Sequence, residues 1–334
     1  YARVQRYKKR LQPDYDGGLC LETVRCIFTL PEGEAEKCRL IHNGQETYAF
    51  IMSNKYNKYS DILRFFIGDV RDKFRLVRAL NGVDYVIHAA ALKQVPACEY
   101  NPMEAVKTNI DGAMNVVESV LDSPSVKRVV ALSTDKAVNP INLYGGTKLV
   151  SDKLFIAGNS YIGKRDLNFS IVRYGNVAGS RGSVIPLFRN IINNGERELP
   201  ITDFGMTRFW IDFHEGIKLV IKAFQYAQGG EVFISKIPSF KITDLAQAML
   251  PGCRMHEIGI REGEKLHEVM ITKEDSDMAY EYDRNFVIYP HYKWWQGEII
   301  PGGIRVEKGF EYNSGTNKEW LDVKQLKDLL SKIE

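Results

Sequence analysis

The chain has 334 residues, of which 44% are hydrophobic and 26% charged, with a formal net charge of +3. These values are typical of a globular protein with one large domain or two interleaved ones, and the small net charge argues against nucleic acid as the main partner. No apolar run approaches the length of a membrane span and no signal peptide opens the chain, so the sequence predicts a cytoplasmic protein without a membrane partner. Five cysteines without metal-type spacing favour reduced thiols.

Apolar runs and helical segments alternate through the first half of the chain. Four nearly continuous apolar runs, of the kind found in strands covered on both faces of a parallel sheet, span residues 63–70, 83–91, 126–135 and 167–177. Three segments with helical spacing lie between them, at residues 71–82, 101–122 and 143–160. In the second of these, one helix face is predicted to carry Val106, Ile110, Ala113 and Val117.

This alternation predicts an α/β fold built on a Rossmann-like doubly wound parallel sheet. After about residue 178 the pattern loosens into shorter elements, which favours a second, smaller substrate-binding α/β domain. We therefore expect a dinucleotide-binding domain over residues 1–178, to which later segments return, and a substrate domain mainly over residues 179–334.

The segment STDKAVNPINLYGGTK combines an acid, two lysines and a tyrosine. Open parallel sheets bind ligands at the carboxyl ends of their strands, and the strand that ends here supplies Ser133, Thr134, Asp135 and Lys136. Tyr144 and Lys148 open the next helix and share one of its faces, because four residues separate them. An isolated pair of this kind is usually a tyrosine packed on a lysine stem, but its place beside the strand end favours catalysis.

The pairing of Tyr144 with Lys148 fits acid–base chemistry. A free tyrosine has a pKa near ~10, too high for a base at neutral pH. An ammonium one turn away and a cationic nicotinamide would favour the phenolate. Such a tyrosine could take a proton from a sugar hydroxyl while a hydride leaves for the cofactor.

Asp135 and Lys136 suggest a second reaction step. Once C4 of a sugar is a ketone, its C5 proton is acidified, and a base there can expel water across C5 and C6. Lys136 could be that base, and Asp135 could protonate the departing hydroxyl. These roles require a partly neutral lysine and a partly protonated aspartate, which burial favours and mutual attraction opposes. A structural ion pair at the strand end is the alternative.

Eight segments extend these motifs into a family pattern that runs from Leu63 to the C-terminus. In chain order they are RFFIGDVRD, VIHAAALKQVP, EYNPMEAVKTNI, ALSTDKAVNPINLYGGTKL, VRYGNVAGSRGSVIPLF, LPITDFGMTRFW, IGIREGEKLHEVMI and FEYNSGTNKEWL. Together they resemble the soluble UDP-N-acetylglucosamine 4,6-dehydratases that invert C5, which belong to the extended short-chain dehydrogenase/reductase superfamily. Enzymes of this type open pseudaminic acid synthesis, which supplies sugar for flagellin and other surface glycans. The resemblance implies UDP-N-acetylglucosamine as substrate and a homo-hexamer.

The resemblance also implies roles for individual residues. Catalysis would rest on Thr134, Asp135, Lys136, Tyr144 and Lys148. The cofactor, NADP held tightly and regenerated in each turnover, or NAD as the alternative, would contact Asp69, Val70, Ala89, Ala90, Ala91, Asn109, Ser133, Tyr144, Lys148 and Val177. The substrate would contact Lys93, Asn176, Arg181, Thr202 and Arg261, with the two arginines suited to the diphosphate.

Residues 1–61 depart from the family pattern. Sequences of this family begin with a strand that leads into a glycine-rich loop. The backbone amides of this loop bind the pyrophosphate at a helix N-terminus. By spacing that loop should fall at residues 19–25, where the sequence is LCLETVR. The segment expected to contact an adenosine 2′-phosphate should fall at residues 44–48, where the sequence is GQETY. The sequence therefore assigns no phosphate-loop residues, and cofactor binding should be impaired if the natural protein has residues 1–61 as they are written here.

Several interpretations stay open at this point. Arg208, Glu264 and Lys265 fit either substrate contacts or ion pairs at a domain interface. A nucleotide-sugar 4-epimerase would share Tyr144 and Lys148 but has no evident use for the Asp-Lys pair, and a non-catalytic relative would need neither. Cys98 is interpreted as a buried thiol. The histidines show no metal-ligand spacing, so the sequence predicts no metal site and a structural role for His88, His214, His256 and His267.

Overall fold

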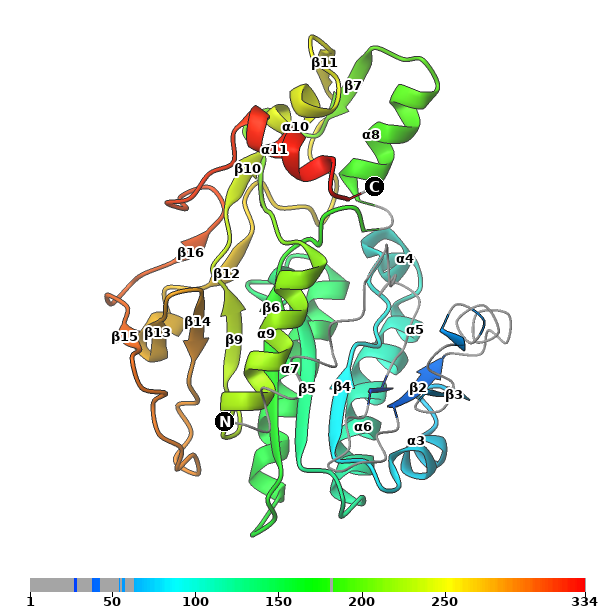
Figure 1. Ribbon diagram of the computed structural model, residues 1–334, viewed down its shortest axis with the longest axis vertical. Helices are drawn as coiled ribbons and strands as arrows, with labels where there is room; N and C mark the ends of the chain where they lie inside the picture. The colour runs from blue at the N-terminus through cyan, green and yellow to red at the C-terminus, as the bar shows by residue number, and fades with distance from the viewer. Residues whose placement is uncertain are drawn as a thin grey trace.

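In this computed structural model the described residues are 27–28, 38–42, 54, 56–57, 63–180 and 183–333. Their centre is an eight-stranded sheet with the strand order β1-β4-β5-β6-β9-β14-β13-β15 (Figure 1). Four consecutive strands in this order are parallel: β4 (Tyr85–His88), β5 (Arg128–Thr134), β6 (Asn168–Tyr174) and β9 (Val232–Ser235). Among the described residues, no helix is both long and apolar enough to cross a membrane.

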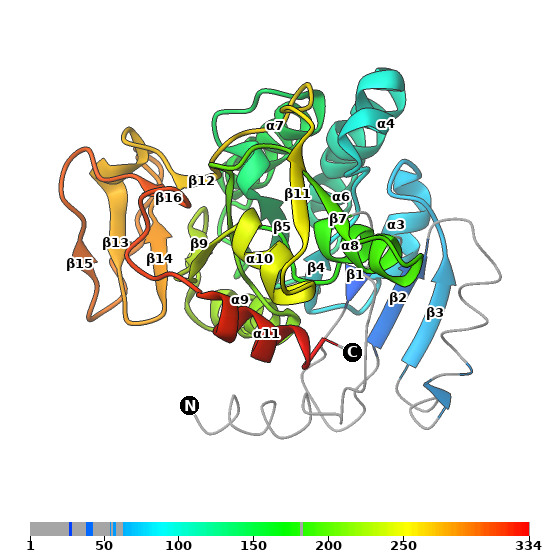
Figure 2. The same ribbon diagram turned by 90° about the horizontal axis from the view of Figure 1, so that it is seen from above.

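The sheet continues with antiparallel strands on both sides of this parallel block. On one side lie β14 (Asn285–Ile288), β13 (Ala279–Glu281) and β15 (Ile304–Arg305). On the other side the two-residue β1 (Ile27–Phe28) pairs with β4. β2 (Cys38–His42) and β3 (Leu63–Ile67) form a separate parallel pair beside this edge (Figure 2). All four predicted apolar runs are thus strands, but the run at 63–70 contributes to the small pair rather than to the main sheet.

Helices cover both faces of the main sheet, which confirms the predicted α/β doubly wound class. Figure 2 shows α6 and α7 on one side and α9 on the other. The helices of this part are α3 (Lys73–Leu80), α4 (Val95–Tyr100), α5 (Pro102–Val106), α6 (Gly112–Leu121), α7 (Leu143–Gly158) and α9 (Phe213–Tyr226).

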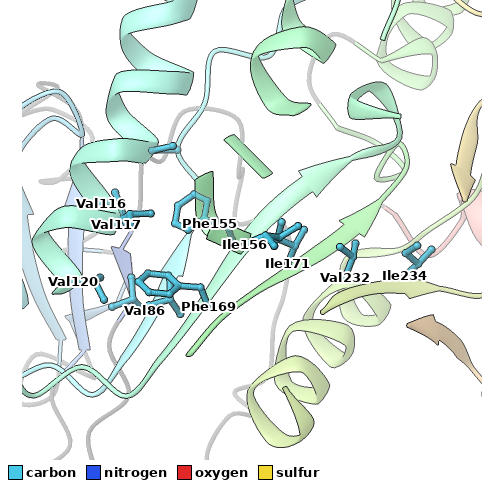
Figure 3. Close-up of a cluster of buried hydrophobic side chains, with 14 of the residues drawn as sticks. Val86, Val116, Val117, Val120, Phe155, Ile156, Phe169, Ile171, Val232 and Ile234 are labelled. Atoms are coloured by element: carbon cyan, nitrogen blue, oxygen red, sulfur yellow. The ribbon is translucent and has the colours of Figure 1, made fainter. Parts of the chain in front are cut away.

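Alternation along the central strands explains the two layers. Side chains at odd positions of β5 and β6 join α6 and α7 in one apolar cluster, which includes Val129, Ala131, Phe155, Phe169 and Ile171. Figure 3 labels Phe155, Phe169 and Ile171 of this cluster. Side chains at even positions join α9 in another, which includes Val130, Val172, Leu219, Val220 and Ala223. Because both faces of each strand are apolar, the strands read as continuous apolar runs in the sequence.

The predicted helix over residues 101–122 has a different phase from the one expected. A π-helical turn, Lys107–Asp111, separates α5 from α6. Ala113 and Val117 are buried as predicted, whereas Val106 and Ile110 are only half-buried. The reason is that a π turn holds more residues than an α turn, so the apolar face shifts at that point. Thr108 and Asn109 face inward instead.

A second apolar cluster lies at the top of Figure 1 and belongs to segments after residue 183. Its helices are α8 (Val184–Asn193), α10 (Ile242–Met249) and α11 (Val323–Leu330). The short sheets of this part pair β7 (Glu198–Ile201) with β11 (Arg254–Glu257), and β8 (Thr207–Phe209) with β10 (Ser239–Lys241). A further pair, β12 (Val269–Ile271) with β16 (Tyr312–Asn313), lies between this part and the main sheet in Figure 1.

Candidate active site

A tight turn at the carboxyl end of β5 places the Asp-Lys pair. Thr134 is the N-cap of a 3-10 turn, Asp135–Ala137: its Oγ1 accepts a 3.3 Å hydrogen bond from the backbone N–H of Lys136. The same hydroxyl donates to Oδ1 of Asp135 at 2.8 Å. The start of α7 packs directly on this turn, because a Cβ at Gly145 would lie 2.1 Å from the carbonyl oxygen of Lys136. The turn and the helix that carries Tyr144 therefore form one rigid unit.

Tyr144 and Lys148 lie one turn apart near the start of α7 and are both buried. Asn142 caps this helix by accepting a 2.7 Å hydrogen bond from the backbone N–H of Gly145. Burial raises the pKa of Tyr144 to about 12, against the opposing charge of Lys136 and a hydrogen bond with Thr134. Burial also lowers the pKa of Lys148, which Asp152 partly offsets. In the protein without cofactor, the cation that lowers the pKa of Tyr144 is thus Lys136 rather than Lys148. Its effect on this pKa is smaller than the opposite effect of burial.

Asp135 and Lys136 form a close ion pair, with 3.1 Å between Nζ and Oδ1. The side chain of Asp135 is 1% exposed and that of Lys136 is 23% exposed. Burial by itself lowers the pKa of Lys136, but the carboxylates of Asp135 and Glu268 outweigh it, so the pKa is raised. Mutual attraction therefore prevails over burial in the protein alone, and Lys136 is an ammonium at neutral pH.

Glu268 is a member of this cluster that the sequence analysis did not single out. Its Oε1 lies 3.4 Å from Nζ of Lys136, and its side chain is 3% exposed. Nζ of Lys136 also lies 3.4 Å from Oδ1 of Asn176. The one signal in the sequence is an acid directly before VMI, the apolar residues of β12.

Arg208, Glu264 and Lys265 lie around the same cluster. Arg208 makes an ion pair of 3.2 Å with Glu264 and approaches Oε1 of Glu268 to 3.8 Å. Lys265 donates a 2.5 Å hydrogen bond to the carbonyl oxygen of Val138. These contacts join the segment at residues 264–268 to β8 and to the turn after β5, which favours the interface interpretation of the three residues.

The residues expected around a dinucleotide follow the strand ends of one sheet edge. Val70, three residues after the end of β3, is buried, and a Cβ at Gly112 would lie 2.7 Å from its side chain. Both oxygens of the neighbouring Asp69 carboxylate accept hydrogen bonds from Arg71. Ala89, Ala90 and Ala91 follow β4 directly, Ser133 lies in β5, and Val177 follows β6 and bridges to Ile211.

Asn109 ties two of these segments together from the π turn. Its side chain accepts from the backbone N–H of Leu92 at 2.7 Å and donates to the carbonyl oxygen of Leu92 at 2.9 Å. It also donates to Oγ1 of Thr147 on α7 at 2.9 Å. Ser133 in turn donates a 2.6 Å hydrogen bond to Oδ2 of Asp152, also on α7. Both residues therefore position the loops and the helix around the expected nicotinamide site.

These features fit the nicotinamide half of a dinucleotide. The three alanines after β4 present small side chains, which permit close approach to the backbone, and Tyr144 and Lys148 are buried at the same edge. The expected phosphate-loop segments, at residues 19–25 and 44–48, lie outside the described residues.

The residues expected to bind substrate lie in several loops of the structure. Asn176 is exposed beside Lys136, Lys93 is half-buried in the loop before α4, and Thr202 follows β7. Arg261 is exposed in the loop after β11, and Arg181 lies outside the described residues. Within the described part, the structure thus brings Asn176 to the Asp-Lys pair.

The remaining reactive side chains have structural surroundings. His88 is buried against Phe155, and burial, with a smaller effect of Lys148, lowers its pKa to about 3. Burial raises the pKa of the Cys98 thiol to about 11. His267 shares a 2.8 Å hydrogen bond with Oγ1 of Thr207, whereas His214 and His256 are exposed. Among the described residues, no group of three or more His, Cys, Asp or Glu side chains could hold a metal ion.

Comparison with known proteins places this site in a family. A family model described as "Polysaccharide biosynthesis protein" matches residues 23–290. The chain belongs to this family. A relative from Campylobacter jejuni, named UDP-N-acetylglucosamine 4,6-dehydratase (inverting), is 50% identical over 302 residues, which cover 88% of this chain and 90% of the relative. The predicted resemblance to that class of dehydratase is therefore confirmed.

Two further proteins that are similar to this chain inform the fold and the competing epimerase function. The solved X-ray structure of Pen from Bacillus thuringiensis is 35% identical, covers 88% of this chain and 89% of its own, and superposes with a TM-score of 0.80. A Rickettsia felis protein named UDP-glucose 4-epimerase is 39% identical and covers 81% of each chain. The dehydratase is thus more similar to this chain than the epimerase is.

Proposed function

We propose that this protein is an inverting UDP-N-acetylglucosamine 4,6-dehydratase. It would oxidise C4 of the sugar, eliminate water across C5 and C6 and return the hydride to C6, giving UDP-2-acetamido-2,6-dideoxy-β-L-arabino-hexos-4-ulose. The observation that carries the proposal is the Asp135–Lys136 pair beside the buried Tyr144, in a chain 50% identical to a relative of that name. This makes the protein a hydro-lyase.

Tyr144 and Lys148 serve the oxidation of C4. Tyr144 takes the proton of the C4 hydroxyl. Lys148, one helical turn after Tyr144, holds the ribose of the cofactor. A nicotinamide bound at this edge would accept a hydride from C4 and later donate it to C6. Because burial raises the pKa of Tyr144, the protein alone does not hold it as a phenolate. NADP, with NAD as the alternative, is proposed on the family resemblance.

Asp135 and Lys136 serve the elimination. Lys136 takes the C5 proton, which the adjacent C4 ketone acidifies, and later returns a proton to the opposite face. Asp135 gives a proton to the C6 hydroxyl, which leaves as water. In the protein alone Lys136 is an ammonium beside a carboxylate, so the active form of the pair arises by transfer of that proton between them. Thr134 orients Asp135 through its 2.8 Å hydrogen bond.

The part of the chain after residue 178 is proposed to bind the uridine diphosphate. Thr202 and Arg261 belong to its loops, and Arg181 is assigned with them from the sequence. Lys93 and Asn176 would contact the sugar from the sheet edge. This division keeps the expected domains, with residues 1–178 for the dinucleotide and 179–334 mainly for the nucleotide sugar.

The finer biological assignments also rest on the resemblance. We propose a cytoplasmic homo-hexamer that commits UDP-N-acetylglucosamine to pseudaminic acid, a sugar used on flagellin and other surface glycans. A nucleotide-sugar 4-epimerase is the competing function, favoured by the 39% identity to the Rickettsia felis relative. The Asp135–Lys136 pair argues for the dehydratase, because return of hydride to C4 needs no second acid–base pair.

The test is the reaction of the purified protein with UDP-N-acetylglucosamine in deuterated water, with and without added NADP or NAD, followed by proton NMR. A 6-deoxy-4-keto product with deuterium and inverted configuration at C5 is expected. Retention of the 6-hydroxyl with inversion at C4 would identify an epimerase. Absence of turnover with either cofactor would contradict the dehydratase function on this substrate.

A further inference from the structure

Two buried carboxylates, rather than one, flank the ammonium group of Lys136. Asp135 is its neighbour in sequence, at 3.1 Å, and Glu268 reaches it from a segment 132 residues further along the chain, at 3.4 Å. Oδ2 of Asp135 and Oε2 of Glu268 are both buried and make no hydrogen bond to any described residue. Buried carboxylate oxygens without partners are costly and are therefore concentrated at functional sites.

The backbone around Glu268 is held firmly. Its N–H donates to Oγ of Ser314 at 2.9 Å, and its carbonyl oxygen accepts from the N–H of Ser314 at 2.8 Å. Two residues earlier, the carbonyl oxygen of Leu266 accepts from the N–H of Thr207 at 3.1 Å. A side chain on a segment fixed in this way can define the position of a flexible lysine.

The charges around the two carboxylates differ. Glu268 lies near three cations, since Arg208 approaches to 3.8 Å and Lys265 interacts electrostatically in addition to Lys136. The guanidinium of Arg208 cannot be deprotonated in a protein, so it gives Glu268 a permanent counter-ion. Asp135 also interacts electrostatically with Lys265, but among the described residues its ion pair is with Lys136, and it accepts a hydrogen bond from Thr134 rather than facing a guanidinium. Among the described residues, Tyr144 also interacts electrostatically with Lys136.

The elimination step needs one carboxyl group that gives a proton and a second one that stays charged. Lys136 Nζ takes the C5 proton, the electrons of the C5–H bond form the C5=C6 bond, and the C6–O bond breaks while Asp135 gives its proton to the leaving hydroxyl. Before this step Asp135 is neutral, so it cannot be the counter-ion of Lys136. A second carboxylate that keeps its charge would stabilise the ammonium as it forms.

We propose that Glu268 is a positioning residue for Lys136: it holds Nζ in place and supplies the carboxylate that balances the ammonium while Asp135 acts as the proton donor. This inference rests on the proposed function, because it assigns Glu268 through the role of Lys136 at C5. Glu268 itself exchanges no proton with the substrate.

The experiment isolates proton transfer at C5 from the hydride steps. The 4-keto-6-deoxy product, made with the wild-type enzyme, is incubated in deuterated water with fresh wild-type, Glu268→Gln, Glu268→Asp or Glu274→Gln enzyme, and loss of the C5 proton signal is followed by NMR over a range of pH. Glu274 is exposed and six residues further along, so its variant is a control for loss of one negative charge. Binding of UDP, measured by calorimetry, reports on the integrity of the site.

In Glu268→Gln we expect the titration of Lys136, seen in the pH dependence of exchange, to move to lower pH, because one of the two carboxylates that raise its pKa is gone. The rate above that titration should fall by roughly tenfold or more, because the base is weaker and no longer held. Glu268→Asp should keep the titration near its wild-type pH with slower exchange, and it serves as the test if the glutamine variant does not fold. Glu274→Gln should match the wild type, and UDP binding should be unchanged throughout.

Wild-type rate and pH dependence in Glu268→Gln would overturn the inference. Equal loss of exchange and of UDP binding would also overturn it, because that result means a packing role. If the wild-type enzyme itself exchanges no C5 proton, the proposed function fails independently of Glu268.

Discussion

The side-chain Nδ2 of Asn142 donates a 2.7 Å hydrogen bond to the carbonyl oxygen of Gly263, 121 residues further along the chain. Oδ1 of the same side chain caps α7 through the N–H of Gly145. One asparagine therefore fixes the start of the helix that carries Tyr144 and also holds the loop that carries Arg261. Gly263 has a positive φ of 74°, and a Cβ there would lie 2.9 Å from Cβ of Asn142, so the two backbones are closely apposed.

Variants of Asn142 should separate these two effects. Asn142→Asp keeps the cap acceptor and loses the donor to Gly263, whereas Asn142→Ala loses both. We expect both variants to raise KM for the UDP-sugar, because the loop with Arg261 is released. Both variants should lose stability in urea unfolding with the bond to Gly263, and the alanine variant should lose about 1 kcal/mol more, the usual value of an N-cap. Unchanged KM in both variants would show that the tether does not serve substrate binding.

Asp135→Asn should slow the elimination without weakening binding. The amide keeps the size of the side chain but has no acidic proton for the leaving hydroxyl. Loss of general acid catalysis typically lowers kcat by roughly 10²–10⁴-fold. Steady-state kinetics should show this fall with little change in KM, and Asp328→Asn, at an exposed position of α11, is the control. A fall confined to kcat/KM through a raised KM would point to a substrate-binding role for Asp135.

Tyr144→Phe should separate oxidation from proton exchange. The variant lacks the hydroxyl that takes the C4 proton, so turnover of UDP-N-acetylglucosamine should fall by roughly 10²–10⁴-fold. Exchange of the C5 proton of the 4-keto product should persist, because that step needs Lys136 and an existing ketone. Lys136→Ala should lose both activities, and Tyr161→Phe, at an exposed position, should lose neither. Loss of C5 exchange in Tyr144→Phe would assign Tyr144 to the elimination as well.

His88 should make the fold sensitive to acid. Its pKa is lowered from 6.5 to about 3 by burial and Lys148, so the unfolded chain binds a proton in that pH window and the folded chain does not. Stability from this group is therefore complete above pH 6.5 and is lost as the pH falls toward 3. Between about pH 7.5 and about pH 5 the loss should be about 2 kcal/mol.

Urea unfolding of His88→Gln at the same two pH values measures this term. Glutamine is uncharged and of similar size, so the variant should lose about 2 kcal/mol less than the wild type on acidification. His214→Gln, on the exposed side of α9, should behave like the wild type. An equal acid loss in wild type and His88→Gln would show that His88 does not set the acid limit.

Local pattern was sufficient for the central layers and for most of the catalytic cluster. The strands β4, β5 and β6 and the helices between them are visible because both faces of these strands are largely covered, which produces continuous apolar runs. Thr134, Asp135, Lys136, Tyr144 and Lys148 could be named because one strand end and the next helix bring them together within a short segment. The family resemblance in turn relied on motifs that are themselves contiguous in the sequence.

Contacts between segments that are distant in the sequence could not be predicted from local pattern. β9 has only four residues and gains its place in the sheet by pairing with β6 and β14, which no local pattern encodes. The phase shift at the π turn depends on the packing that turns Asn109 inward. The third member of the ion cluster, Glu268, reaches Lys136 across 132 residues. The sequence determined which groups are present and which of them are neighbours along the chain. Only the tertiary structure decided which charges share one buried site, because Coulomb and hydrogen-bond interactions depend on distance in space rather than on separation in sequence.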